Sequence, residues 1–170
     1  MLSRAAAIVT GSPLWAESYA RRFGAEKVLV SMNGFDPEDY PLHAPCEQDA
    51  DREILNLVHT GPIIPGRRDP RILFPGVAAL GQGTKKVQIT LMGENADAAL
   101  EIATEERVQR QVKVLTPVSR AHAIEARYTA DALALSLWND PREAGVVPDA
   151  LFECIGTRRP LIVSGPSKGI

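Results

Sequence analysis

The sequence predicts a doubly wound α/β fold, in which a parallel sheet is covered by helices on both faces. Short runs rich in β-branched and other apolar residues alternate along the chain with stretches in which apolar residues recur at helical spacing. The strand-like runs are apolar at nearly every position, which is typical of parallel strands that are buried on both faces. A chain of 170 residues is also long enough to bury a core of its own.

The elements follow one another in regular order. The predicted strands are 5–10, 27–31, 54–60, 87–92, 111–116, 132–137 and 160–164. The predicted helices lie between them, at 13–23, about 70–82, about 95–108, 119–129 and 148–157. Residues that favour helix starts support four of these helices: Ser12 before Pro13, Asp69 before Pro70, Asn95 near Asp97, and Ser119.

Composition and charge exclude several classes of protein. The formal net charge of -2 lacks the basic excess of nucleic-acid-binding domains. The longest apolar runs fall far short of the ~18 to 20 residues of a membrane span, and the N-terminus has too short an apolar core for a signal peptide. Cys46 and Cys154 form no CxxC and no metal-ligand spacing, so no metal is expected. These features predict a cytoplasmic protein.

Residues 36–52 are acidic, contain proline and have no apolar period. They predict a surface linker or an extended excursion. This linker separates a short leading βα unit from a longer βα array.

Ligands of a doubly wound sheet bind beyond the carboxyl ends of its strands, so the loops after Thr60, Met92, Thr116, Leu137 and Ser164 are the candidate site. The loop after Thr60 has Gly61 and Gly66 at the spacing of a P-loop. However, arginines follow where a P-loop has lysine and a hydroxyl, and Pro62 and Pro65 remove two backbone donors. A nucleoside triphosphatase is therefore not expected.

Two interpretations of Arg67 and Arg68 remain. In the first, a tight turn at Gly61 and the guanidinium groups form a metal-free diphosphate clamp at the start of a helix. In the second, the two arginines are solvated and pair with Asp69.

Glu153 lies among apolar residues of the predicted helix 148–157. Its carboxylate would be poorly solvated unless it points toward the ligand crevice, where it could accept both hydroxyls of a ribose. The alternative is an ion pair with Arg158 or Arg159.

Four segments, in order along nearly the whole chain, carry a family resemblance. They are AIVTGSPLWAESYARRFG (7–24), VSMNGFDPEDY (30–40), LVHTGPIIPGRRDP (57–70) and VVPDALFECIGTRRPLIV (146–163). Together they resemble the donor-binding half of the retaining GT-B glycosyltransferases of group 1, or family 4, which include bacterial polysaccharide and mannosyl or glucosyl transferases.

The resemblance implies a Rossmann-like half of a GT-B fold. Residues 1–35 would be the last βα unit of the acceptor domain with the interdomain connection, and 36–170 a donor-binding domain that is incomplete at its C-terminus. It implies a fragment of a hexosyltransferase that moves a sugar from a nucleotide diphosphate sugar to an acceptor hydroxyl with retention, in polysaccharide or glycoconjugate biosynthesis. Whether the fragment is itself active is left open.

The same resemblance implies the partners of the full-length protein. The donor is a nucleotide sugar, and no separate cofactor is expected. The acceptor, a glycan or a lipid-linked sugar, would bind through the missing N-terminal domain. A cytoplasmic location, peripheral at the inner membrane for the full-length protein, is compatible with this reading.

Particular residues receive roles from the resemblance. Gly61 and Arg67 would face the donor diphosphate, with Arg67 and Arg68 stabilising the leaving group. The loop from Thr116 to Val118 would lie against the base, and Glu153 would hold the ribose. The transferred sugar is expected near a loop whose candidate contacts are Asn139, Asp140 and Glu143, for which solvated loop residues are the alternative.

The sequence departs from the family at three positions. Gly145, Ala150 and Pro62 stand where the family has an acidic residue that contacts the sugar, a lysine and an arginine. Because of these departures, a non-catalytic α/β module, derived from the fold, that binds a nucleotide or a partner stays open as the alternative. A nucleotide-sugar epimerase, another alternative, would need acid–base residues that we do not identify.

Three further side chains have two interpretations each. His59 ends a strand near the clamp, but a hydrogen-bonded core or rim histidine is the favoured reading. Trp15 and Trp138 are either stacking platforms for a sugar or packing residues at the ends of elements.

Overall fold

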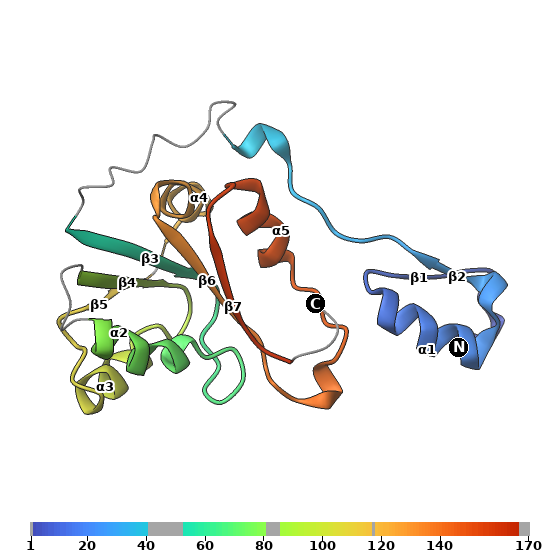
Figure 1. Ribbon diagram of the computed structural model, residues 1–170. Coiled ribbons are helices and arrows are strands. Elements are labelled where there is room, and N and C mark those ends of the chain that lie inside the picture. Colours follow the sequence, from blue (N-terminus) through green and yellow to red (C-terminus); the bar gives the residue numbers. More distant parts are fainter. Residues whose placement is uncertain (1, 41–52, 81–85, 117, 167–170) are drawn as a thin grey trace.

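The computed structural model describes residues 2–40, 53–80, 86–116 and 118–166, and it has the predicted parallel α/β architecture (Figure 1). Five parallel strands form the main sheet in the order β5-β4-β3-β6-β7. Their bounds are β3 Ile54–Thr60, β4 Lys86–Met92, β5 Val112–Leu115, β6 Ala132–Ser136 and β7 Leu161–Ser164. Every strand predicted in this part of the chain is confirmed.

Helices cover both faces of this sheet (Figure 1). α2 (Phe74–Leu80) and α3 (Ala98–Glu105) pack on one face, and α4 (Arg120–Thr129) and α5 (Asp149–Gly156) pack on the other. Consecutive residues of β3 point to opposite faces, so Leu57 joins the core under α2 and α3 while Val58 joins the core under α4 and α5. The sheet is therefore buried on both sides, as its apolar strands predict.

The order of the strands reverses at β3. The chain runs outward from β3 through β4 to β5, then returns to the other side of β3 and runs outward through β6 to β7. Because the helices change face where the chain changes direction along the sheet, the crossovers of the main sheet share one hand, and parallel crossovers are as a rule right-handed. This reversal places a crevice at the carboxyl ends of β3 and β6.

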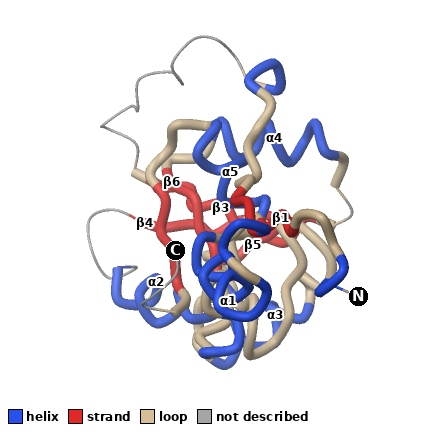
Figure 2. The backbone as a smooth tube through the Cα atoms, turned by 90° about the vertical axis from the view of Figure 1, so that its right-hand side faces the viewer, coloured by secondary structure: helices blue, strands red, loops and turns tan. Residues whose placement is uncertain are grey.

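The leading part of the chain forms a separate two-stranded parallel sheet. β1 (Ile8–Thr10) pairs with β2 (Val28–Val30), and α1 (Pro13–Phe23) connects them. An extended segment joins this unit to the main body (Figure 1), and Figure 2 views the molecule from the side on which the unit lies.

Direct contacts join the leading unit to the main body. Trp15 Nε1 donates a hydrogen bond to the carbonyl oxygen of Ala144 over 3.1 Å. Asn33 Nδ2 donates to the carboxylate of Asp149 at the start of α5. The end of α1 that begins with Ser12 and Pro13 therefore faces the loop that follows β6.

The described part of the predicted linker is exposed at residues 36–38, as a surface linker should be, but it ends in a buried residue, Tyr40. Pro37–Asp39 forms a 3-10 turn, and the ring of Tyr40 is buried against Phe35 at 5.6 Å between centroids. The Tyr40 hydroxyl donates to the backbone carbonyl of Glu153 over 3.0 Å. The rest of the linker, residues 41–52 with His43 and Cys46, lies outside the described residues.

Three of the four predicted helix starts are confirmed. Ser12, Asp69 and Ser119 each accept a backbone N–H with the side chain, from Trp15, Arg71 and His122 respectively. Asp69 caps a 3-10 turn, Pro70–Leu73, that leads into α2.

The fourth predicted start, Asn95 near Asp97, is right in part. Asp97 occupies the N-cap position of α3, which begins at Ala98, but its side chain makes no capping hydrogen bond. Asn95 has a φ of 58° and lies in a left-handed turn before the helix. No helix within the described ranges has the length and apolarity needed to cross a bilayer.

The loops after β3 and β4 approach each other closely. The N–H of Gly61 donates to the carbonyl of Met92 over 2.8 Å. Gly93 has a φ of 144°, and a Cβ at this position would overlap the carbonyl group of Gly61. The loop that carries Arg67 can therefore pass this close to the loop after β4 only because residue 93 has no side chain.

Gly93→Ala should destabilise the protein by roughly 2 kcal/mol or more, because the methyl group meets backbone and the φ is unfavourable for alanine. Gly76→Ala is the matched control, since Gly76 lies in α2 with open space around its Cα. The control should be neutral or stabilising by up to about 1 kcal/mol. Urea denaturation measures both, and equal stabilities of the two variants would contradict the close approach of the loops.

Candidate functional site

A cavity of about 290 Å³ lies at the carboxyl ends of β3, β6 and β7. Its lining includes Gly66 and Arg67 from the loop after β3, Leu137 and Asn139 from the loop after β6, and Ser164 at the end of β7. This is the place where the reversal of strand order leaves a crevice. The predicted residues Arg67 and Asn139 therefore line one cavity.

A tight turn presents Arg67. The N–H of Arg67 donates to the carbonyl of Ile64 over 2.9 Å, and the N–H of Ile64 donates to the carbonyl of Arg68 over 3.0 Å. Gly66 has a φ of 72°, which favours glycine at the tip of the turn. Arg67 is exposed, and Arg68 is half-buried outside the cavity lining.

Asp69 does not pair with Arg67 or Arg68, so the pairing in that predicted alternative is wrong, although Arg67 is solvated as it predicted. Its carboxylate binds Nε and Nη2 of Arg71 and accepts the N–H of Gly66 over 3.0 Å. Partial burial raises the pKa of Asp69, but the hydrogen bonds from Arg71 and Gly66 outweigh this effect and lower it below its usual value. Among the described residues, Arg67 and Arg68 form no ion pair.

The ring of Trp138 contacts two guanidinium groups. The Cζ atom of Arg67 lies 4.4 Å from the ring centroid, and that of Arg142 lies 4.7 Å from it. Trp138 follows β6, so it meets Arg67 across the same crevice. Trp138 was predicted either to stack on a sugar or to pack at the end of a strand. The structure adds a third interaction, a cation–π contact with arginine side chains.

Asp140 is bound by Arg142. Nε and Nη2 of Arg142 donate to the two carboxylate oxygens over 2.9 and 2.8 Å. These hydrogen bonds, with a smaller contribution from the charge of Arg67, lower the pKa of Asp140 to about 2. Glu143, the third predicted sugar contact of this loop, is half-buried in the 3-10 turn Pro141–Glu143.

Glu153 pairs with Arg127, so the predicted alternative of Arg158 or Arg159 is wrong. The side chain of Arg127 is only 4% exposed and that of Glu153 is 33% exposed. Arg127 Nε also donates to the carbonyl of Ala123 over 3.2 Å. The guanidinium of Arg159 is used differently, since its Nε donates to the carbonyl of Tyr128.

Arg127 is not among the predicted site residues, although the sequence contains a signal for it. Arg127 follows Ala126, which packs against the core under α4 and α5, and precedes Ala130, which is buried in that core just after the helix ends. A charge so close to the apolar stripe of a helix requires a partner, because an unpaired buried charge is costly.

The residues predicted for the base and ribose do not line the cavity at Arg67. Thr116 is exposed, Val118 packs on the core under α4 and α5, and Glu153 lies on that same face of the sheet. Pro117 lies outside the described residues. Gly61 uses its N–H for Met92, so it offers a tight turn rather than a donor. The roles of these residues in binding remain predictions.

Gly145 is buried beneath the leading unit. It has a φ of 87°, and a Cβ there would overlap Ser12, Leu14 and Trp15. A side chain at this position would thus displace the start of α1. This gives a physical reason for glycine at the position where the resembling family has an acidic residue.

His59 is a hydrogen-bonded core histidine, as the favoured interpretation predicted. It is 2% exposed, and its Nδ1 lies 3.1 Å from the carbonyl oxygen of Ala134 on β6. Nε2 is buried without a hydrogen-bond partner among the described residues. Burial lowers the pKa of His59, and the smaller effects of the Ala134 carbonyl and the Asp69 charge do not offset it.

Within the described ranges, no group of three His, Cys, Asp or Glu side chains is arranged to hold a metal ion. Cys154 lies in the core under α4 and α5, where burial raises the pKa of its thiol to about 11. The thiol is therefore protonated near neutral pH.

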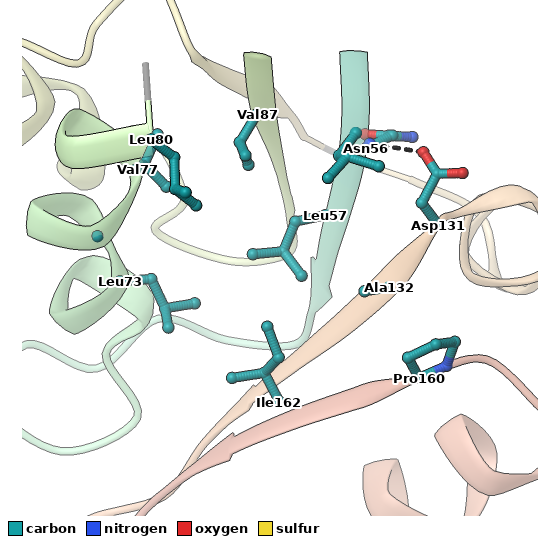
Figure 3. A pocket seen from close by; sticks show the side chains of 12 residues that line it. Asn56, Leu57, Leu73, Val77, Leu80, Val87, Asp131, Ala132, Pro160 and Ile162 are labelled. Carbon is teal, nitrogen blue, oxygen red and sulfur yellow. Dashed lines mark hydrogen bonds between the residues drawn. The ribbon is translucent and has the colours of Figure 1, made fainter. Parts of the chain in front are cut away.

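A second cavity, of about 350 Å³, lies at the amino ends of the strands (Figure 3). Leu73 of the 3-10 turn and Val77 of α2 face Leu57 and Ile162 of the sheet across it. Asp131 accepts the N–H of Asn56 at its edge over 2.7 Å. No cationic side chain is present among its described lining residues. This cavity is therefore unsuited to a phosphorylated ligand.

The lowered pKa of His59 should make folding depend on pH. Because the pKa is below 6.5 in the folded state, the unfolded state binds more protons between the folded value and 6.5. The free energy of unfolding should therefore fall as pH decreases below 6.5, by at most about 1.4 kcal/mol per pH unit.

Urea denaturation between pH 7.5 and 5.5 measures this dependence. His59→Gln keeps a donor for the Ala134 carbonyl but does not titrate, so its stability should fall less over this range. His122→Gln, at an exposed position of α4, should keep the wild-type slope. If the stability of His59→Gln fell with pH as steeply as that of the wild type, His59 would not be the source of this pH dependence.

Comparisons with known proteins bear on the fold. A scan against models of protein families and a search of curated proteins gave no match. Among solved structures, the apo form of the lipopolysaccharide outer core galactosyltransferase WaaB superposes with a TM-score of 0.70 at 18% identity, over 94% of this chain and 43% of that one. WaaG, a glycosyltransferase involved in lipopolysaccharide biosynthesis, gives 0.67 at 15% identity, over 91% and 43%.

The pneumococcal O-GlcNAc transferase GtfA, solved in complex with UDP and GlcNAc, gives a TM-score of 0.64 at 10% identity, over 98% of this chain and 32% of that one. The chain thus spans less than half the length of these structures. The likeness extends through the β1–β2 unit as well as the main sheet, since it covers nearly all of the chain. The fold of this chain is therefore that of one part of these glycosyltransferase structures, as the GT-B resemblance predicted.

Proposed function

We propose that this chain is the nucleotide-sugar-binding part of a glycosyltransferase. The reaction is transfer of a sugar from a nucleotide diphosphate sugar to an acceptor hydroxyl with retention, in polysaccharide or glycoconjugate biosynthesis. One observation supports the proposal most directly: Arg67 lines the cavity that lies where the strand order reverses. Among the described residues, no carboxylate forms an ion pair with it.

The chemistry of the site fits a leaving diphosphate. Breaking the bond between the sugar and the diphosphate builds negative charge on the phosphate oxygens. The Arg67 guanidinium can receive two of these oxygens in a planar bidentate contact, and Arg68 adds positive charge behind it. This is stabilisation of a developing charge by groups that are already in position.

The neighbours support a nucleotide sugar as the ligand. GtfA was solved with UDP and GlcNAc, and WaaB is described as a galactosyltransferase. In this proposal, residues 1–35 belong to the acceptor domain and residues 36–170 to the donor domain. Asn139 contacts the transferred sugar from the cavity wall, and the partly exposed carboxylate of Glu153 binds the ribose.

Two observations favour a second candidate, a non-catalytic module derived from the same fold. The start of α1 covers Gly145, so no acidic side chain can contact a sugar from there. Arg127 also holds the carboxylate of Glu153. In its partner-binding form, such a module would keep the fold while lacking affinity for the donor.

Titration calorimetry with UDP, GDP and dTDP distinguishes these candidates. We expect saturable binding of at least one diphosphate, weakened about 10- to 100-fold by Arg67→Ala because a charge-assisted contact to phosphate is lost. Arg110→Ala, an equal charge change at an exposed position before β5, should bind like the wild type. Absence of binding to all three would favour the module, and equal binding by Arg67→Ala would refute the clamp.

Variants of the Arg127–Glu153 pair test the role of the carboxylate. Glu153→Gln leaves Arg127 buried without its counter-charge and should cost about 2–4 kcal/mol of stability, somewhat less than for a fully buried pair. Combining it with Arg127→Met should restore much of the loss. If Glu153 binds ribose, the stabilised double variant should still bind the nucleotide several-fold more weakly than the wild type. Wild-type affinity in that variant would make the carboxylate purely structural.

A further inference from the structure

We infer that Trp138 is a positioning residue for Arg67, whose guanidinium group it holds at the mouth of the cavity through the face of the indole ring. The inference rests on the proposed function, because the position of Arg67 matters only if this side chain receives an anionic ligand. Trp138 acts here through Arg67, and the ligand that the pair serves is a nucleoside diphosphate.

Arg67 needs such support. Its side chain is exposed at the tip of a tight turn, and within the described residues its guanidinium has no hydrogen bond and no ion pair. A long, exposed side chain without a partner populates many rotamers, and binding must order it. The contact with Trp138, at 4.4 Å from Cζ to the ring centroid, is the interaction that limits this freedom.

Trp138 is itself well placed to hold a side chain. The residue before it, Leu137, is buried and donates its N–H to the carbonyl of Ser164 over 2.7 Å, which extends the pairing of β6 with β7. The carbonyl of Trp138 accepts the N–H of Asp140 over 2.9 Å. The indole ring is half-buried, and Leu137 rather than Trp138 fills the core at this point.

The charges around the ring leave Arg67 as the cation available to a ligand. Arg142 also contacts the ring, but both carboxylate oxygens of Asp140 bind its guanidinium. The Asp140–Arg142 pair is therefore nearly neutral, whereas Arg67 has no such partner among the described residues. Arg67 is also the member of this cluster that lines the cavity together with Asn139.

The experiment measures affinity by calorimetry, with whichever of UDP, GDP and dTDP the wild type binds most tightly. Trp138→Leu should weaken binding about 3- to 10-fold, because the ring is lost while an apolar side chain remains. Trp138→Phe keeps an aromatic face and should stay within about 2-fold of the wild type. Trp138→Leu in an Arg67→Ala background should weaken binding no further, since the ring acts through Arg67.

A spectroscopic readout accompanies these affinities. Trp15 and Trp138 are the two tryptophans of the chain, so Trp15→Phe leaves Trp138 as the sole indole fluorophore. In that background, the emission of Trp138 should change when Arg67 is replaced by alanine and when the nucleotide binds. This readout needs no Trp138 variant, so it holds even if Trp138→Leu fails to fold.

The outcomes are separable. Wild-type affinity in Trp138→Leu, together with weak binding by Arg67→Ala, would overturn the inference and leave the proposed function standing. Additive losses in the double variant would mean that Trp138 contacts the ligand itself, which also overturns the inference. Emission of Trp138 that is insensitive to Arg67→Ala would overturn it as well. No binding by the wild type would end the proposed function, and the inference with it.

Discussion

The position of β3 in the sheet is the constraint on which the rest of the structure depends. β3 pairs with β4 on one side and with β6 on the other, and all three strands run parallel. Its carboxyl end is therefore the point where chain segments far apart in sequence meet. Arg67 follows β3 and Trp138 follows β6. These two residues meet because β6 pairs with the edge of β3 that β4 leaves free, although β4 and β5 lie between β3 and β6 in the sequence.

The charged residues near this point fall into two groups. In the first group, each of three carboxylates binds one arginine. The Asp69–Arg71 pair lies at the start of the 3-10 turn before α2. The Glu153–Arg127 pair joins α5 to α4, and the Asp140–Arg142 pair lies within the loop after β6. Arg67 belongs to neither an ion pair nor a hydrogen-bonded network of the described side chains. A positive charge without an ion-pair partner among the described residues, beside a cavity, is the kind of group that an anionic ligand can bind.

The sequence alone predicts most of the fold, because strands and helices depend on local periodicity and local caps. The alternation of Leu57 and Val58 and the caps at Ser12 and Ser119 all act within a few residues. The choice of ion-pair partner depends on strand order and helix rotation, which no short segment contains. This is why Asp69 with Arg71 and Glu153 with Arg127 were not predicted, while Arg67 and Asn139 were placed at the right edge of the sheet.

The bare backbone at Gly145 has a consequence for how the two sheets can move. Ser12, Leu14 and Trp15 rest on a surface without a side chain, so no protruding group interlocks the two sheets at this point. The bonds from Trp15 to Ala144 and from Asn33 to Asp149 are polar, and water can replace each of them. Neither apolar core of the main sheet includes a residue of the leading unit, so a shift of that unit at this spot would exchange these polar bonds without repacking either core.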